Sequence, residues 1–228
     1  MIIQNPEKRR RSLPNLADPM AKLIPFKALL PKQDIMATVP TRSLYTYSEK
    51  ERKETLNSNP TSFLHVLYPD YKQGPRKKGI ARYKTIRQKL LEFKDMGVFI
   101  QDEEAKFYVY TISYDDLSFS GIIAGVSTSD YDEDVIKKHE DTLQRRVELF
   151  TKYLEHVQFN AEPVLLTYPD NPSISNWITK IKSEEPHTSF HGADGGIHSL
   201  WAVSGADAQK ELKTLFASIP AIYIADGH

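Results

Sequence analysis

The stretch KFYVYTISYDDLSFSGIIAGVS, residues 106–127, decides the fold class. Its first part, Lys106–Tyr114, is aromatic and alternates with the period of two expected of a strand. Its last part, Phe119–Ser127, is an apolar strand pattern with two glycines. Asp115 and Asp116 supply turn residues between the two, so the stretch predicts an antiparallel hairpin. In a chain that also carries helical periodicity, this hairpin indicates an α+β or mixed α/β fold.

Helix and strand patterns follow on both sides of this hairpin. On its N-terminal side, Ser48 and Glu51 form a capping-box pattern for a helix that we expect to end near residues 57–60. A second helix with one apolar face covers residues 80–93. The remaining predicted elements are strands at residues 63–68, 163–169, 200–203 and 221–225, and helices at residues 142–157, 174–181 and 206–216.

The helix predicted over residues 142–157 is strongly amphipathic. Its apolar side chains recur every three or four residues, so we expect them to point into the core. They are Leu143, Val147, Phe150, Tyr153, Leu154 and Val157.

The same patterns divide the chain into three parts. Residues 1–19 contain the basic run Lys8–Arg11 and predict a disordered extension, or alternatively a basic arm that touches nucleic acid or an anionic surface. Residues 20–130 predict an N-terminal α+β subdomain, and residues 131–228 a second subdomain in which helices and strands alternate.

The composition excludes several classes of function. Thirty basic and thirty acidic residues give a net charge of zero, which argues against a dedicated nucleic-acid binder. The absence of cysteine excludes disulfides and thiolate metal sites and suits the cytoplasm. No apolar run approaches the roughly 18 to 20 residues that span a bilayer, so we expect no membrane partner. Composition does not indicate an oligomeric state.

The richest cluster of chemical groups is VIKKHEDTLQRR, residues 135–146. On a helix, Lys138, Thr142 and Arg145 would share one face. Lysine and arginine there could hold a polyanion, while Glu140 or His139 acts as a base. A solvated helix N-terminus has the same composition, so the residues alone leave both interpretations open.

A second cluster is YIADGH, residues 223–228. A strand that ends in Asp226-Gly227-His228 places an acid and an imidazole at the carboxyl end of a sheet strand, where α/β sheets bind ligands. The alternative is a tight turn with Asp226 as a helix cap.

Other candidates carry weaker signals. His65 lies in an apolar run and predicts a core histidine with a backbone partner. His187, His191 and His198 invite a zinc interpretation, which their irregular spacing disfavours. Tyr168 could line a pocket or pack in the core. The common ATP, dinucleotide, hydrolase and zincin motifs are absent from the sequence.

Several stretches together resemble one bacterial family, called domain of unknown function 1015. They are MAKLIPFKALLP, NPTSFLHVLYPDY, YKTIRQKLLEFKDMGVFIQDE, FYVYTI, GIIAGVSTSDYDEDVIKKHEDT, FNAEPVLLTYPDN and YIADGH. The resemblance covers nearly all of residues 20–228, and its most specific motifs are K-x-H-E-x-T, residues 137–142, and the final A-D-G-H. In that family the last motif continues as A-D-G-H-H-R and a helix, which implies that this chain is truncated there.

The D-G-H-H-R motif is in turn similar to the phosphate-binding motif of the ParB/sulfiredoxin-like superfamily. That superfamily includes free serine kinases, which phosphorylate L-serine with ADP or ATP. The resemblance therefore implies that residues 131–228 form an incomplete domain of this type. It also implies Mg²⁺ and an adenine nucleotide as cofactors, and serine or a similar hydroxyl compound as substrate. The alternatives are a nucleotide-binding regulator without turnover and an inactive fragment.

The resemblance assigns a role to eight residues. The expected catalytic residues are Glu140, as the base, with His139 and Asp226, and Asp226 is also the expected Mg²⁺ ligand. The expected phosphate-binding residues are Lys137, Lys138, Thr142, Gly227 and His228.

Overall fold

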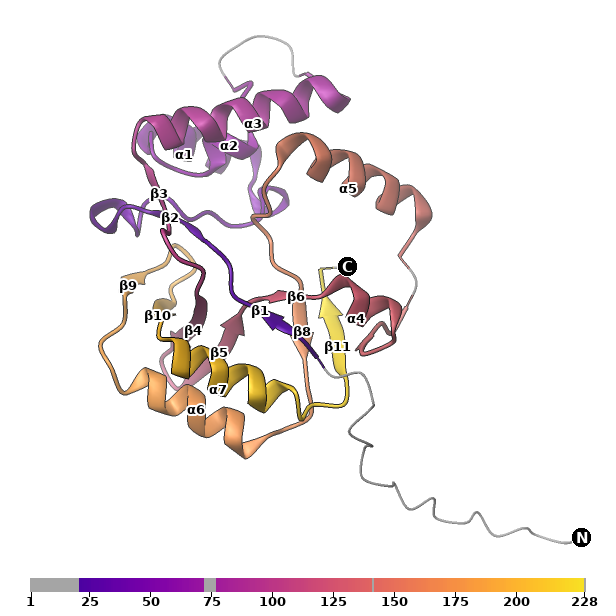
Figure 1. Cartoon of the computed structure of the whole chain (residues 1–228). Coiled ribbons are helices and arrows are strands. Elements are labelled where there is room, and N and C mark those ends of the chain that lie inside the picture. The colour runs from indigo at the N-terminus through magenta and orange to yellow at the C-terminus, as the bar shows by residue number, and fades with distance from the viewer. Residues whose placement is uncertain (1–20, 72–76, 141, 228) are drawn as a thin grey trace, which may run out of the picture.

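The computed structural model describes residues 21–71, 77–140 and 142–227, and it confirms the α+β class (Figure 1). The α-helices are α1 (Glu49–Ser58), α2 (Leu64–Leu67), α3 (Gly79–Asp95), α4 (Thr128–Asp132), α5 (Gln144–Val157), α6 (Pro172–Lys182) and α7 (Ala206–Phe216). The strands are β1 (Leu23–Ile24), β2 (Leu29–Pro31), β3 (Phe99–Gln101), β4 (Phe107–Tyr114), β5 (Leu117–Ile123), β6 (Gly125–Val126), β7 (Ile136–Lys137), β8 (Leu165–Thr167), β9 (Thr188–His191), β10 (Ile197–Val203) and β11 (Ile222–Asp226).

The largest sheet is antiparallel and has the strand order β5-β4-β10-β9. The predicted hairpin is confirmed as β4 and β5, which join through a turn in which Asp115 has a φ of 24°. Strand β4 also pairs with β10, from Phe107 opposite Val203 to Ser113 opposite Ile197. The sheet therefore takes two strands from each side of residue 130.

One face of this sheet is covered by α6 and α7, which lie side by side in Figure 1. Strand β4 sends Phe107 and Val109, both 0% exposed, toward Trp177 of α6 and Leu212 of α7. Each such side chain contributes roughly 1.5–3 kcal/mol on burial. The helices are therefore held by alternate residues of the strand.

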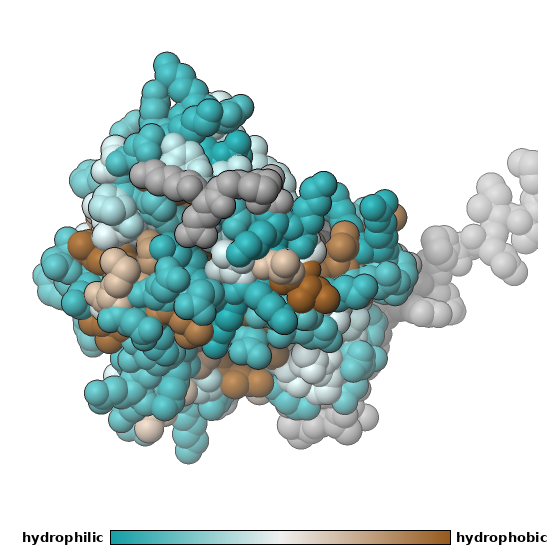
Figure 2. All heavy atoms as spheres, turned by 90° about the horizontal axis from the view of Figure 1, so that it is seen from above, coloured by the Kyte–Doolittle hydropathy of each residue, from teal (hydrophilic) through white to brown (hydrophobic). Residues whose placement is uncertain are grey.

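A second hydrophobic core lies under α3, beside the pair β2 and β3 (Figure 1). Its buried members are Val39, Val66, Ile86, Leu90, Phe93, Val98, Phe99 and Val157. Val157 is the last residue of α5, so this core too combines both sides of residue 130. Seen from the helical side, hydrophilic residues cover most of the surface above it (Figure 2).

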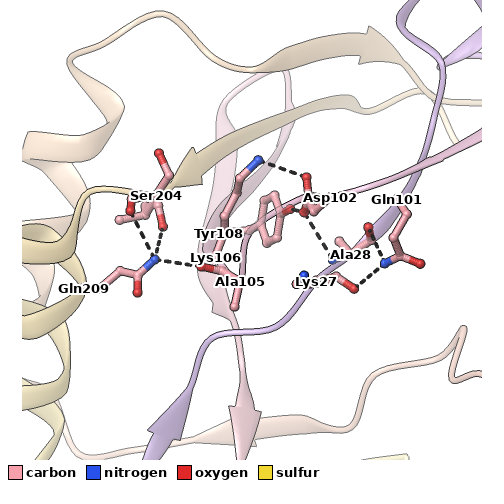
Figure 3. Close-up of polar contacts among 10 residues, drawn as sticks. Lys27, Ala28, Gln101, Asp102, Ala105, Lys106, Tyr108, Ser204 and Gln209 are labelled. Carbon is pink, nitrogen blue, oxygen red and sulfur yellow. Dashed lines mark hydrogen bonds and ion pairs between the residues drawn. The ribbon is translucent and has the colours of Figure 1, made fainter.

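A polar network fixes β2 and β3 against β4 (Figure 3). The Asp102 carboxylate accepts the backbone N–H of Ala28 at 3.1 Å, the Lys106 ammonium at 2.9 Å and the Tyr108 hydroxyl. On the other side of β4, Gln209 of α7 donates to two backbone carbonyl groups beside β4 and β10, both at 3.0 Å. Such networks specify one arrangement when every member has a partner.

Two predictions about these elements are wrong. Residues 63–68 form the short helix α2 rather than a strand, with Leu64 and Val66 both 0% exposed. A short apolar run buried on every side lacks the polar positions that separate a strand from a helix. The predicted partner of His65 is nonetheless present, because its ring nitrogen lies 3.1 Å from the carbonyl oxygen of Asn59.

The second wrong prediction concerns the apolar face of α5. Its side chains at Leu143, Val147, Phe150 and Leu154 are 41–69% exposed, whereas Val157 is 0% exposed. The helix contacts α3 through one flank only, where Tyr153 packs edge-on against Tyr83 with ring centroids 5.3 Å apart. The apolar stripe is therefore wider than the surface that α3 covers. Figure 1 shows α5 beside α3, with its C-terminal end toward the helical core.

The other predicted elements are confirmed within a few residues, including the capping box in which Ser48 and Glu51 exchange hydrogen bonds at the start of α1. The predicted extension, residues 1–19, lies outside the described residues. In the described ranges, no helix combines the length and the apolar character needed to cross a bilayer.

Candidate functional site

The two motifs singled out in the sequence lie on neighbouring strands. A three-stranded sheet has the order β7-β11-β8, in which β7 is parallel to β11 and β8 is antiparallel to it. Ile136 pairs with Ile222 and Lys137 with Tyr223. Parallel strands end at the same sheet edge, so the segments that follow β7 and β11 emerge together.

His139 provides a direct link between these segments. Its Nδ1–H donates to the carbonyl oxygen of Ile224 in β11 at 3.1 Å. The segment after β7 therefore stays beside β11 for two residues beyond the last register pair. The other ring nitrogen, Nε2, lies 3.9 Å from Glu140 Oε1.

The two lysines of the motif contact residues that precede β7. Lys137 Nζ lies 2.9 Å from the carboxylate of Asp134, and this hydrogen bond raises the pKa of Lys137. Lys138 Nζ lies 5.8 Å from the ring centre of Tyr131, a cation–π contact. Both ammonium groups are thus held by residues of α4 and of the segment that leads from it into β7.

Glu140 and Thr142 do not lie on a helix. Residues 138–140 form a bend after β7, and α5 begins only at Gln144. The expectation that Lys138, Thr142 and Arg145 share one helical face is therefore wrong. The cause is the pairing of residues 136–137 with β11, which takes the backbone out of helical conformation. The side chain of Glu140 is 64% exposed, so its carboxylate is open to solvent.

Strand β11 ends at Asp226 with an irregular register, and Gly227 follows it. The register with β8 shifts between Ile224 and Asp226, which is a bulge. The carboxylate of Asp226 then accepts the N–H of Gly227 at 2.8 Å. Gly227 has a φ of +82°, in the left-handed region that suits glycine, and a Cβ there would lie 3.4 Å from the Cα of Val164. His228 lies outside the described residues.

The buried carboxylate of Asp130 is a structural part of this region that the sequence did not reveal. Asp130 in α4 is 1% exposed and accepts the backbone N–H of Lys22 at 2.7 Å, while its second oxygen lies 3.8 Å from Lys22 Nζ. Its own carbonyl oxygen accepts the N–H of Val135, directly before β7. Asp130 thereby ties β1 to the strand that carries the motif. In the sequence, Asp130 stands in a run of Ser and Asp residues that does not distinguish a buried acid from an exposed one.

The weaker candidates find structural explanations. The ring of Tyr168 packs edge-on against Phe216 with centroids 5.1 Å apart, and burial raises its pKa. His198 contacts aromatic and acidic neighbours in the large sheet. Across the described ranges, no three His, Asp or Glu side chains are grouped in a way that could hold a metal ion.

The arrangement at this sheet edge suits an anionic ligand. The side chain of His139 contacts β11, whereas Lys137 and Lys138 contact Asp134 and Tyr131, and Asp226 accepts the N–H of Gly227. The segments that carry these basic and acidic groups are neighbours in the sheet. A magnesium ion often takes only one or two protein carboxylates and completes its shell with water and substrate phosphates, so the single carboxylate of Asp226 fits that mode.

Comparison with known proteins gives one result. Residues 23–228 match the family model described as "Protein of unknown function (DUF1015)". No curated protein and no solved structure matches the chain. The match spans most of the sequence, including both motifs of the sheet edge, and the chain therefore belongs to the DUF1015 family.

Proposed function

We propose that the chain is a nucleotide-dependent phosphotransferase of ParB/sulfiredoxin-like type that acts on serine or a similar small hydroxyl compound. The observation that carries the proposal is the parallel pairing of β7 with β11, together with the bond from His139 to Ile224. Residues 85 positions apart in the sequence meet there, and both segments carry groups suited to a phosphate.

The residues at the sheet edge divide the work of phosphoryl transfer. Lys137 and Lys138 neutralise phosphate charge, and Gly227, with its φ of +82°, lets the backbone leave β11 beside the phosphates. Glu140 accepts the proton of the substrate hydroxyl while the hydroxyl oxygen bonds to the transferred phosphorus. The bond from that phosphorus to the nucleotide breaks, and the nucleotide leaves with the electron pair. Positioning and charge neutralisation supply most of the catalysis in this class of reaction.

Asp226 would hold the Mg²⁺ ion, which supplies further neutralisation of phosphate charge when bound. His139 positions the segment after β7, because its bond to Ile224 fixes the backbone directly before Glu140. His228 and Thr142 would complete the phosphate contacts.

A second function, nucleotide binding without turnover, is supported by the 64% exposure of the Glu140 side chain. General bases work at their best in positions where neighbours tune their protonation. If the exposed carboxylate of Glu140 does not contact a substrate, the protein would bind a nucleotide without turnover and act as a regulator.

One experiment tests both functions. The chain is incubated with L-serine, Mg²⁺ and either ADP or ATP, and phosphoserine is measured by mass spectrometry, while nucleotide binding is measured separately by calorimetry. We expect phosphoserine from the parent chain and none from Glu140→Gln, with nucleotide binding kept in both. Glu155→Gln, an exposed acid on α5, is the matched control and should behave as the parent.

The two measurements separate the possible results. Nucleotide binding without phosphoserine from the parent chain would refute the kinase and favour the regulator. Absence of binding in the parent chain would contradict both. Equal phosphoserine from Glu140→Gln would retain a kinase but remove Glu140 as its base.

A further inference from the structure

The second face of the large sheet, opposite α6 and α7, carries a group of connected polar and aromatic side chains. Alternation along β4 places Tyr110 on the face away from Phe107 and Val109. Strand β10 places His198 on that same face, and β9 adds Phe190, which pairs with His198 across the strands. This face is separate from the sheet edge at β7 and β11.

The side chains form a chain of short hydrogen bonds. The hydroxyl of Tyr110 lies 2.5 Å from Nδ1 of His198, and Nε2 of the same ring lies 2.9 Å from the carboxylate of Asp194. That carboxylate also accepts the hydroxyl of Tyr114 and the backbone N–H of Gly196, at 3.0 and 3.1 Å. A phenol, an imidazole and a carboxylate are thus connected in series.

The surroundings hold the imidazole ring in place. Phe190 stacks on His198 with ring centroids 5.1 Å apart and an angle of 7° between the planes. A side chain at Gly192 would overlap both Nε2 of His198 and the carboxylate of Asp194, so only glycine leaves room for the pair. The glycine-rich turn between β9 and β10 is therefore shaped around this contact.

The charges settle the direction of the hydrogen bonds. The bond from His198 is the main cause that lowers the pKa of Asp194 to about 2, so Asp194 is an ionised acceptor at neutral pH. Nε2 must then carry a proton, which leaves Nδ1 of a neutral ring as an acceptor. Burial, and secondarily the charge of Asp194, raises the pKa of Tyr110, so its hydroxyl keeps its proton and donates it to Nδ1.

There is room for a small molecule beside Tyr110. The residue opposite it on β5 is Gly121, and a Cβ built there would have no atom within 4 Å. Two positions along β5, the side chain of Phe119 is 58% exposed on the same face. The open space and the exposed ring lie on the β5 side of Tyr110, and its hydroxyl reaches across β4 to His198 of β10.

We propose that Tyr110 is a nucleophile activated by His198, and that it accepts the acyl or phosphoryl group of an activated ester or anhydride. The Tyr110 oxygen forms a bond to the electrophilic carbon or phosphorus, its proton passes to Nδ1 of His198, and the leaving group departs with its electron pair. Asp194 is a positioning residue, since it acts through His198. A nucleophile, a base within hydrogen-bond reach and a third group that orients the base are the parts that such chemistry requires.

An arylsulfonyl fluoride tests the proposal without knowledge of the natural substrate. The tyrosine oxygen displaces fluoride from sulfur, and peptide mass spectrometry reports the rate at each tyrosine of the intact chain. Tyr45, which is 95% exposed and lies outside this group, is the internal control. We expect Tyr110 to react about tenfold or more faster than Tyr45 despite its lower exposure, because a positioned base accelerates proton removal.

Two variants separate activation from access. His198→Phe keeps a ring stacked on Phe190 but removes the base, and should slow labelling of Tyr110 by about tenfold or more with Tyr45 unchanged. Gly121→Val fills the open space, leaves the hydrogen bonds intact and should also slow labelling. Circular dichroism confirms that each variant is folded.

Labelling of Tyr110 no faster than that of Tyr45 would overturn the proposal. So would an unchanged Tyr110 rate in folded His198→Phe. If His198→Phe does not fold, the labelling rates of Tyr110 in the parent and in Gly121→Val still test the proposal. A phenol that is not activated would react no faster than Tyr45 in the parent, so Gly121→Val would have no excess rate to remove.

Discussion

At the scale of single residues, the buried carboxylate of Asp130 is the anchor of the candidate site. It is 1% exposed, accepts the backbone N–H of Lys22 directly before β1 and lies at the start of the segment that leads into β7. A buried donor that loses its acceptor costs more free energy than the hydrogen bond itself contributes.

Replacement of Asp130 should therefore destabilise the fold more when the new side chain lacks an acceptor oxygen. Asp130→Ala leaves the N–H of Lys22 without its partner and should lower the free energy of unfolding by about 1–3 kcal/mol. Asp130→Asn keeps an acceptor oxygen and should cost less. Urea denaturation of the three proteins measures both changes, and equal losses from the two variants would show that the carboxylate charge, rather than the hydrogen bond, matters.

Individual contacts were the least predictable part of the molecule. The motif residues Lys137 and His139 belong to a cluster that its chemical composition singled out, and a family resemblance then assigned their roles. Their place beside β11 followed from no local pattern. The bond from His139 to Ile224 joins residues far apart in sequence, and only the paired strands bring them within 3.1 Å. Asp130 gave no signal that separates a buried acid from a solvated one.

At the scale of elements, α5 shows where periodicity informs and where it misleads. The amphipathic pattern predicted a helix at nearly the correct residues. It also predicted that every apolar side chain of the stripe is buried, and most of them are exposed. The spacing of apolar residues gives the width of the apolar face of a helix. How much of that face is buried depends on how much of it the neighbouring elements cover.

Two valines of α5 make a matched test of this difference. Val147 is 41% exposed and Val157 is 0% exposed, so the same substitution removes the same atoms from two environments on one helix. Val157→Ala should lower the free energy of unfolding by about 2 kcal/mol, and Val147→Ala should change it by no more than about 0.5 kcal/mol. A large loss from Val147→Ala in thermal or urea denaturation would mean that this face is covered in solution.

At the scale of the whole molecule, the fold is held together across residue 130. Strand β4 pairs with β10 along its length, and the core under α6 and α7 combines Phe107 and Val109 with Trp177 and Leu212. The α+β class was predictable, because hairpin and helix patterns are local. The order of strands in the sheet was not, because pairing of β4 with β10 depends on long-range burial.

The two parts of the chain should therefore depend on each other to fold. Residues 20–130 alone leave β4 without β10, and residues 131–228 alone leave α6 and α7 without the strand that they cover. We expect each piece to lack a cooperative thermal transition, and the mixed pieces to recover it in part. A sharp transition in either piece by itself would identify that piece as an independent domain.

The proposed function requires that the segments after β7 and β11 form a single nucleotide-phosphate site. Calorimetric titration of the chain with Mg²⁺–ADP and Mg²⁺–ATP measures this most directly, with Lys137→Ala and Asp226→Asn as variants from the two segments and Lys152→Ala on α5 as control. We expect both site variants to weaken binding by about tenfold or more, because charge-assisted contacts to phosphate contribute about 1.5–3 kcal/mol each. The control should bind as the parent does. Binding that is unaffected by either site variant, or absent from the parent chain, would contradict the proposed function.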